Sequence, residues 1–252
     1  MVGGVSWAMV GFDEYIEPMF RRFFEGLAAK MPSQCAVCRA WPAQPVCEAC
    51  VARFAQPRVR CRRCALPVAE GVVDCGQCLA APAPLDACHA ALSYEYPWSM
   101  LVTQYKFGGQ PSWAASFATL MRSAPWIEPA LDDVDVVLPM PLARERLAER
   151  GFNQALALAR ALAPGKCDPA LLLRVRHTQA QSALDLKGRL RNVQGAFAVE
   201  PLRFADLRGK NVGLVDDVMT SGASLFSAAQ ALRQAGAARV TGLVLARTDE
   251  PH

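Results

Sequence analysis

The chain has 252 residues, of which 52% are hydrophobic and 20% carry a charged side chain. This composition excludes a disordered chain, and the length accommodates one α/β domain with a small appended module. The formal net charge of +4 is compatible with anionic ligands, but it is too small to indicate nucleic-acid binding by itself.

Residues 1–31 are expected to contribute an N-terminal amphipathic helix. Apolar residues recur at helical spacing over 15–31, with Arg21 and Arg22 on the opposite face, and Pro32 follows. Such a stripe packs most often on the protein's own core, although a partner or a membrane surface would also accept it. The chain start lacks the features of a signal peptide, and no segment has about 18 uncharged apolar residues. We therefore expect a soluble, cytoplasmic protein without a transmembrane segment.

Residues 32–84 are rich in cysteine and are expected to form a double zinc ribbon. Eight of the ten cysteines form four C-x-x-C pairs, separated by eight, ten and ten residues. Two residues between ligands let a tight turn direct both sulfurs to one ion, and two such turns complete the tetrahedron that Zn²⁺ prefers. Sequential pairing predicts two structural zinc sites, one from Cys35, Cys38, Cys47 and Cys50 and one from Cys61, Cys64, Cys75 and Cys78. Interleaved pairing, a redox pair, an iron–sulfur cluster and disulfides are the alternatives, of which disulfides are disfavoured in a non-exported chain.

Five arginines and no acidic residue lie between residues 51 and 65. These arginines are Arg53, Arg58, Arg60, Arg62 and Arg63. They predict a locally positive surface, and the simplest interpretation of these arginines is a solvated face. Arg62 and Arg63 could also offset part of the negative charge of a zinc–thiolate centre. Few aromatic residues interleave with them, so the stacking expected of a strong single-strand binder is weak. The two remaining cysteines, Cys88 and Cys167, are expected to be ordinary packed residues.

From residue 85 to residue 252, alternating strand and helix patterns predict an α/β domain with a mainly parallel sheet and helices on both faces. The proline-containing stretch 80–84 marks the expected boundary. Strands are expected at 89–96, 134–138, 171–175, 196–199, 212–216 and 240–246. Helices are expected at 98–107, 112–123, 142–150, 153–162 and 224–234. Ligands of such sheets bind at the carboxyl ends of the strands.

The sharpest functional signal is the pair Asp216 and Asp217, which is expected at the end of a strand and is followed by a loop of small residues. The loop residues are Thr220, Ser221, Gly222, Ala223 and Ser224. Backbone N–H groups and hydroxyls at a helix N-terminus bind phosphate, and glycine lets the backbone approach closely. The two carboxylates could accept hydrogen bonds from ribose hydroxyls and face a Mg²⁺ ion. The alternative is a strand that happens to precede an ordinary Ser/Thr helix cap.

This pattern resembles the loop with which type I phosphoribosyltransferases bind 5-phosphoribosyl pyrophosphate (PRPP). Further residues resemble one branch, the ComF (GntX-like) family, which combines a double zinc ribbon with a domain of this kind. These residues are Gln104 to Gly108, Leu138 to Leu142, Arg146, Arg150 to Gln154, Thr178, Gln181, Leu184, Arg189, Asn192 and Phe197. The resemblance covers about residues 35–247.

The resemblance implies that PRPP binds with Mg²⁺ and that a nitrogen nucleophile displaces pyrophosphate from the ribose. The implied pyrophosphate loop and its arginines are Pro139, Met140, Pro141, Arg146 and Arg150. The segment 176–191 would close over PRPP and exclude water, with Arg189 and Arg150 as the catalytic arginines. Surface solvation is the alternative for the arginines.

Two features distinguish this sequence from the phosphoribosyltransferases that it resembles. Thr220 stands where 6-oxopurine salvage enzymes carry an acidic base, which disfavours that substrate class. The sequence ends shortly after the last expected strand, so only the region before Val134 is expected to cover the acceptor. The implied function is PRPP-dependent transfer linked to DNA uptake in natural competence. The alternatives are a catalytically inactive PRPP sensor and an adaptor that binds single-stranded DNA, a competence helicase or another DNA-processing protein.

Overall fold

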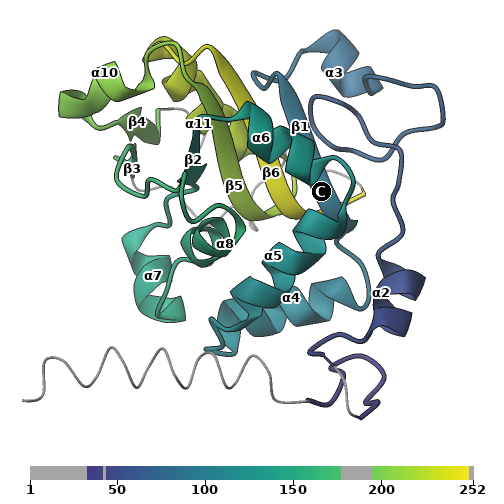
Figure 1. Ribbon diagram of the computed structural model, residues 1–252. Coiled ribbons are helices and arrows are strands. Elements are labelled where there is room, and N and C mark those ends of the chain that lie inside the picture. Colours follow the sequence, from purple (N-terminus) through teal and green to yellow (C-terminus); the bar gives the residue numbers. More distant parts are fainter. Residues whose placement is uncertain (1–32, 42–43, 177–194, 250–252) are drawn as a thin grey trace, which may run out of the picture. The chain divides into compact units, whose positions relative to one another are not determined.

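The computed structural model describes residues 33–41, 44–176 and 195–249 (Figure 1). The chain consists of two compact units, residues 1–48 and 49–252. The helix expected within residues 1–31 lies outside the described residues. The same holds for five residues of the family resemblance, Thr178, Gln181, Leu184, Arg189 and Asn192.

A four-stranded sheet forms the centre of the second unit, and its strands run parallel in the order β1-β6-β5-β2. The strands are β1 (Ala87–Ser93), β2 (Val136–Pro139), β5 (Asn211–Met219) and β6 (Arg239–Arg247). A separate antiparallel pair consists of β3 (Leu172–Arg174) and β4 (Phe197–Val199). Nearly continuous apolar runs favour strands that are buried on both faces, as in β6, where eight consecutive residues are buried. The predicted mainly parallel sheet is confirmed.

Helices lie on both faces of this sheet, with α8 and α11 on opposite sides (Figure 1). The helices are α2 (Glu48–Phe54), α3 (Gly76–Ala80), α4 (Trp98–Phe107), α5 (Trp113–Ser123), α6 (Ile127–Asp133), α7 (Arg144–Arg150), α8 (Gln154–Leu162), the 3₁₀ helix η2 (Pro201–Arg203), α10 (Phe204–Leu207) and α11 (Ala223–Gln234). Sequence reasoning missed α6, which contains Pro129. The proline lies in the first turn, where its missing N–H removes no intrahelical hydrogen bond.

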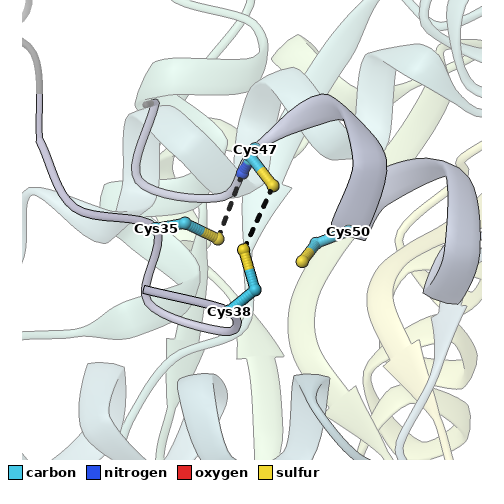
Figure 2. Close-up of side chains that lie close together, drawn as sticks. All are labelled: Cys35, Cys38, Cys47 and Cys50. Carbon is cyan, nitrogen blue, oxygen red and sulfur yellow. Dashed lines mark hydrogen bonds between the residues drawn. The ribbon is translucent and has the colours of Figure 1, made fainter. Parts of the chain in front are cut away.

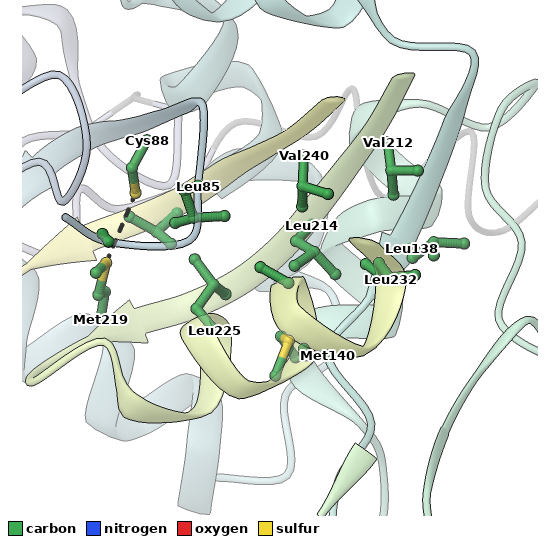
Figure 3. Packing of buried hydrophobic residues seen from close by; sticks show 14 of the residues in the cluster. Leu85, Cys88, Leu138, Met140, Val212, Leu214, Met219, Leu225, Leu232 and Val240 are labelled. Carbon is green, nitrogen blue, oxygen red and sulfur yellow. Dashed lines mark hydrogen bonds between the residues drawn. The ribbon is translucent and has the colours of Figure 1, made fainter. Parts of the chain in front are cut away.

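The core between α11 and the sheet is built from aliphatic side chains (Figure 3). Leu225 and Leu232 of α11 belong to the same buried cluster as Leu214 of β5 and Val240 of β6. This cluster also contains all the cysteines of the second predicted zinc site, which are Cys61, Cys64, Cys75 and Cys78. The second cysteine group therefore packs across the domain boundary predicted after residue 84, and that boundary stays a prediction.

Within the described ranges, no helix combines the length and apolar character needed to cross a lipid bilayer.

Candidate functional site

A cavity of about 450 Å³ opens at the carboxyl ends of β2 and β5, the edge at which parallel sheets bind their ligands. It is lined by residues of both predicted phosphate segments and of α7. The predicted site residues among them are Met140, Pro141, Arg146, Arg150, Asp216, Asp217, Thr220 and Ser224. Four other predicted residues, Pro139, Ser221, Gly222 and Ala223, belong to the same segments but do not line the cavity.

The two aspartates lie inside β5 rather than at its end. The strand continues to Met219, because parallel pairing with β6 extends as far as Met219 opposite Arg247. The predicted strand end at residue 216 is therefore wrong. Burial, followed by the neighbouring charge of Asp217, raises the pKa of Asp216 to about 7. A cation in the cavity would favour the ionised form of Asp216.

The last turn of α4 reaches this acidic pair. Lys106 Nζ lies 3.2 Å from Asp217 Oδ1, and both side chains are largely buried. The preceding residue, Tyr105, donates a hydrogen bond of 2.7 Å from its hydroxyl to the carbonyl oxygen of Gln154. On the other side of Lys106, the guanidinium of Arg150 stacks over the ring of Phe107, 5.1 Å from its centroid. Three consecutive residues of α4 thus contact parts of the site.

The turn between α7 and α8 fixes the pyrophosphate segment predicted from the sequence. Asn153 caps α8 by accepting a hydrogen bond from Leu156 N at 3.3 Å, and its Nδ2 donates to the carbonyl oxygen of Met140 at 3.1 Å. One side chain therefore sets both the start of α8 and the path of the chain after β2.

Two buried donors of this region have no hydrogen-bond acceptor among the described residues. They are Nε of Arg150 and Nε2 of Gln154. The side chain of Gln154 is 1% exposed, its Oε1 accepts from Arg150 Nη1 at 3.0 Å, and both residues line the cavity. Because buried donors are nearly always paired, these groups favour a bound acceptor such as a phosphate oxygen.

The loop between β5 and α11 forms the other wall. Gly222 caps α11 with a left-handed φ of 78°. A Cβ at this position would lie 2.5 Å from Met219 Cε and 2.7 Å from Phe226 Cζ, so only glycine fits without displacement of its neighbours. Thr220 and Ser224 line the cavity beside the start of α11. The first N–H groups of a helix have no intrahelical partner and favour an anion there.

Eight residues that line the cavity were not predicted as site residues, although Lys106, Leu142, Asn153 and Gln154 belong to the segments that resemble the ComF family. The eight residues are Tyr94, Lys106, Leu142, Asn153, Gln154, Ala155, Arg174 and Val218. Tyr94 directly follows β1 and Arg174 ends β3, so their places at strand ends were a usable signal. The pKa of Arg174 is lowered by burial and then by the charge of Arg146, which indicates that cationic groups gather at this end of the cavity.

The first cysteine group brings four sulfurs together (Figure 2). The Sγ atoms of Cys35, Cys38, Cys47 and Cys50 all lie within 4.8 Å of one another, and Cys38 and Cys47 are 3.6 Å apart. Sulfurs of a Zn(Cys)₄ tetrahedron lie about 3.8 Å apart, given Zn–S bonds of about 2.3 Å. Burial alone would raise the pKa of Cys35, but backbone N–H donors, including that of Cys47, lower it to about 6.

The second cysteine group repeats this arrangement in the core of the second unit. All four of its cysteines are buried, their sulfurs lie within 4.8 Å of one another, and Cys64 and Cys75 are 3.6 Å apart. The N–H of Cys75 donates to the sulfur of Cys61 at 3.3 Å. Both groups have the sequential pairing that was predicted, and both fit a single tetrahedral ion such as zinc.

Of the two cysteines outside these groups, Cys88 is 3% exposed and Cys167 is partly buried. The thiol of Cys88 lies 3.6 Å from Met219 Sδ, and burial raises its pKa to about 12. Cys88 is therefore an unreactive packed residue, as predicted.

The arginines between residues 51 and 65 do not form an unpaired basic face. Arg58 pairs with Glu95 and Asp249. Both Arg62 and Arg63 pair with Asp74. Most of the positive charge expected in this stretch is thus balanced by acids from other segments.

Comparison with known proteins gives related sequences over most of the chain. No family model matches it. The chain is 33% identical over 227 residues to the DNA utilization protein YhgH of Salmonella typhimurium, and the match covers 86% of this chain and 98% of that protein. It is 30% identical over 195 residues to Competence protein F of Haemophilus influenzae, covering 74% of this chain and 84% of that protein.

A shorter match links the chain to Competence protein ComFC of Bacillus subtilis, with 35% identity over 114 residues and 45% of each protein covered. Among solved structures, the allosteric regulatory enzyme of purine biosynthesis matches 47% of this chain and 24% of its own. Its TM-score of 0.29 and its 20% identity are too low to carry an argument about this chain.

Proposed function

Because this chain belongs to the ComF (GntX-like) family, we propose that it binds PRPP with Mg²⁺ in the cavity beside β5 and transfers the phosphoribosyl group to a nitrogen acceptor. The observation that carries this proposal is the pair Asp216 and Asp217 in a cavity that also contains four cationic side chains. Those side chains are Lys106, Arg146, Arg150 and Arg174. The cavity volume of about 450 Å³ lies within the usual range of small-molecule sites.

The chemistry of the lining residues suits a sugar that carries phosphates. The carboxylates of Asp216 and Asp217 accept hydrogen bonds, as ribose hydroxyls require, and they are oxygen ligands of the kind that Mg²⁺ prefers. The hydroxyls of Thr220 and Ser224 lie at the start of α11, where a 5′-phosphate would meet backbone N–H groups. Bound Mg²⁺ would supply positive charge that helps pyrophosphate to leave.

The arginines carry the protein's own part of the proposed reaction. Arg146 and Arg150 line the cavity beside Met140 and Pro141, where their guanidinium groups can pair with two phosphate oxygens at once. Positive charge at that position stabilises pyrophosphate as the bond to the ribose breaks, so no covalent nucleophile is needed. Gln154 and Asn153 hold Arg150 and the segment at Met140 in place.

Lys106 extends this proposal to a residue that was not predicted to belong to the site. It lies in the last turn of α4 and lines the cavity. Its ammonium group pairs with Asp217. We propose that its ammonium group faces the bound ligand, and that the carboxylate of Asp217 would hold Mg²⁺.

Turnover tests the proposal directly. The metal-loaded protein is incubated with PRPP, Mg²⁺ and a panel of primary amines and nitrogen bases, and the release of pyrophosphate is measured. Acceptor-dependent release that is abolished in Asp217→Asn and retained in Lys210→Met, an exposed lysine remote from the cavity lining, supports transfer. PRPP binding without turnover across the panel would contradict transfer and favour a PRPP sensor.

The names of the relatives connect them with DNA use and competence. We propose that the phosphoribosyl chemistry of this chain serves the handling of DNA. The ion pairs of Arg58, Arg62 and Arg63 weaken the case for direct binding of single-stranded DNA by the arginine stretch. Binding to a single-stranded oligonucleotide that falls steeply with salt, and falls further in Arg53→Ala, would instead favour the adaptor alternative.

A further inference from the structure

Arg247, the last residue of β6, is a buried cation that contacts two functional parts of the second unit. Its side chain is 2% exposed. Its Nε donates to the carbonyl oxygen of Cys64 at 3.0 Å, and its Nη1 donates to the carbonyl oxygen of Met219 at 3.3 Å. The same nitrogen donates to the carbonyl oxygen of Thr248 at 2.6 Å and to its hydroxyl at 3.0 Å.

These acceptors belong to different sites. The carbonyl of Cys64 lies in a turn of the second cysteine group, whose four sulfurs are placed for one metal ion. The carbonyl of Met219 ends β5 directly before Thr220, where the loop beside the cavity begins. It also accepts a hydrogen bond from Thr248 N at 3.2 Å. One guanidinium therefore connects the metal-binding turn to the first residue of the ribose-phosphate loop.

The charge of Arg247 needs compensation, because a buried cation without a nearby anion is costly. Within the described ranges its partners are neutral oxygens rather than carboxylates. Arg60, a second arginine at the same turn, donates to the carbonyl of Ala65 at 3.1 Å and to the hydroxyl of Ser93 at 2.8 Å.

Asp249, which pairs with Arg58, is one acid near these arginines. A divalent metal ion held by four thiolates would add further negative charge. The group as a whole carries a formal charge of about −2, since four thiolates outweigh one divalent cation. The buried Arg247 and the partly buried Arg60, whose donors reach the carbonyls of Cys64 and Ala65, would balance that charge. The four cysteines are suited to bind one tetrahedral ion. The two arginines are suited to the negative charge that the ion and its four thiolates would carry together.

We propose that Arg247 is a positioning residue through which the metal-loaded second cysteine group sets the conformation of the loop Thr220–Ser224 and its affinity for a phosphorylated ribose. The part of this inference that concerns affinity rests on the proposed function. With metal bound, the turn at Cys64 is rigid and the guanidinium is compensated, so Met219 and the loop after it are held. Without metal, no ion holds the four sulfurs together, so the turn at Cys64 is released and Arg247 no longer supports the loop. The second zinc module is then a component of the ligand site rather than an independent docking module.

Hydrogen–deuterium exchange of the full-length, zinc-loaded protein tests this coupling without any ligand. The readout is the exchange rate of backbone amides in the peptide spanning residues 218–225, with metal content measured by native mass spectrometry. The variants are Arg247→Met and Arg247→Lys. The matched control is Arg239→Met, at the opposite end of the same strand, where the arginine pairs with Asp133 on the surface.

Arg247→Met is expected to retain two metal ions per chain. Exchange of the loop is expected to become about tenfold faster or more, because the loss of one charge-assisted hydrogen bond changes an equilibrium by about this factor. Arg247→Lys, which keeps the charge, is expected to show a smaller increase, and Arg239→Met none. Wild-type exchange in Arg247→Met would overturn the proposal. An equal increase in Arg239→Met would also overturn it, because the effect would then be general to the strand.

A second measurement decides the matter if Arg247→Met does not fold. Metal is removed from the wild-type protein with a chelator, and loop exchange is followed together with metal content. Faster exchange in residues 218–225 as the second ion leaves supports the coupling, and unchanged exchange after complete metal loss contradicts it.

Titration with Mg²⁺ and PRPP completes the test, and the affinity for PRPP is expected to fall about tenfold in Arg247→Met. If the wild-type protein does not bind PRPP, the proposed function fails, while the exchange experiment still decides the coupling.

Discussion

The pairing of Lys106 with Asp217 gives a prediction that can be worked out from the structure. The two charged atoms are 3.2 Å apart, and the side chains are 16% and 10% exposed. Coulomb's law with an effective dielectric constant of about 20 gives an attraction of about 5 kcal/mol at this distance. Part of this attraction offsets the desolvation of both groups, so we expect Lys106→Met to lower the free energy of unfolding by about 3 kcal/mol. Without the lysine, the carboxylates of Asp216 and Asp217 lie side by side with less compensation.

Urea denaturation of the ligand-free protein measures this effect in a double-mutant cycle with Asp217→Asn. The expected coupling energy between the two side chains is about 2 kcal/mol, and the control Lys210→Met on the surface should change stability by less than about 0.5 kcal/mol. Millimolar Mg²⁺ should stabilise Lys106→Met more than the wild-type protein, because the cation then meets no competing ammonium group. A coupling energy below about 0.5 kcal/mol, as in exposed pairs, or equal stabilisation by Mg²⁺ would refute this reasoning.

Three further predictions concern the loop, a surface ion pair and the metals. Gly222→Ala should destabilise the fold by about 2–4 kcal/mol in chemical denaturation, because Gly222 has a left-handed φ and the Cβ of an alanine would meet Met219 and Phe226. Wild-type stability of this variant would contradict the loop geometry. The Arg203 guanidinium holds the pKa of Asp168 below its usual range. The stability this pair contributes is therefore present above about pH 4 and is lost as the pH falls through the folded-state pKa, so Asp168→Asn should be less stable than wild type at pH 7 and closer to it in acid; a constant difference across this range would refute the assignment. Chelation of both metals should lower the melting temperature by about 10 °C or more, and an unchanged melting curve after metal loss would exclude structural metal sites.

The fold could be predicted well where the signal is local. Apolar periodicity located α4, α5, α8 and α11, and β-branched runs located the central strands, because both depend on neighbours within a few residues. The spacing of the C-x-x-C pairs gave the correct grouping of sulfurs. The end of β5 was misplaced, since its continuation past Asp216 depends on pairing with β6, which short-range patterns do not show.

The candidate site could be predicted in part. The loop and the aspartates were found because they occupy one continuous segment whose residue types suit phosphate and Mg²⁺. Lys106 and Arg247 were not assigned roles, because each acts on a partner that is distant in the sequence: Asp217 for the former, and Cys64 and Met219 for the latter. An isolated lysine or arginine in a helix or strand gives no indication of such a partner.

Calorimetric titration of the zinc-loaded protein with PRPP, in the presence and absence of Mg²⁺, tests the central claim most directly. We expect saturable binding in the presence of Mg²⁺, an affinity at least about tenfold lower in Asp217→Asn, and wild-type affinity in Arg58→Ala, whose arginine forms ion pairs away from the cavity lining. Absence of binding to the wild-type protein, or equal affinities for all three proteins, would contradict the assignment of this cavity to PRPP.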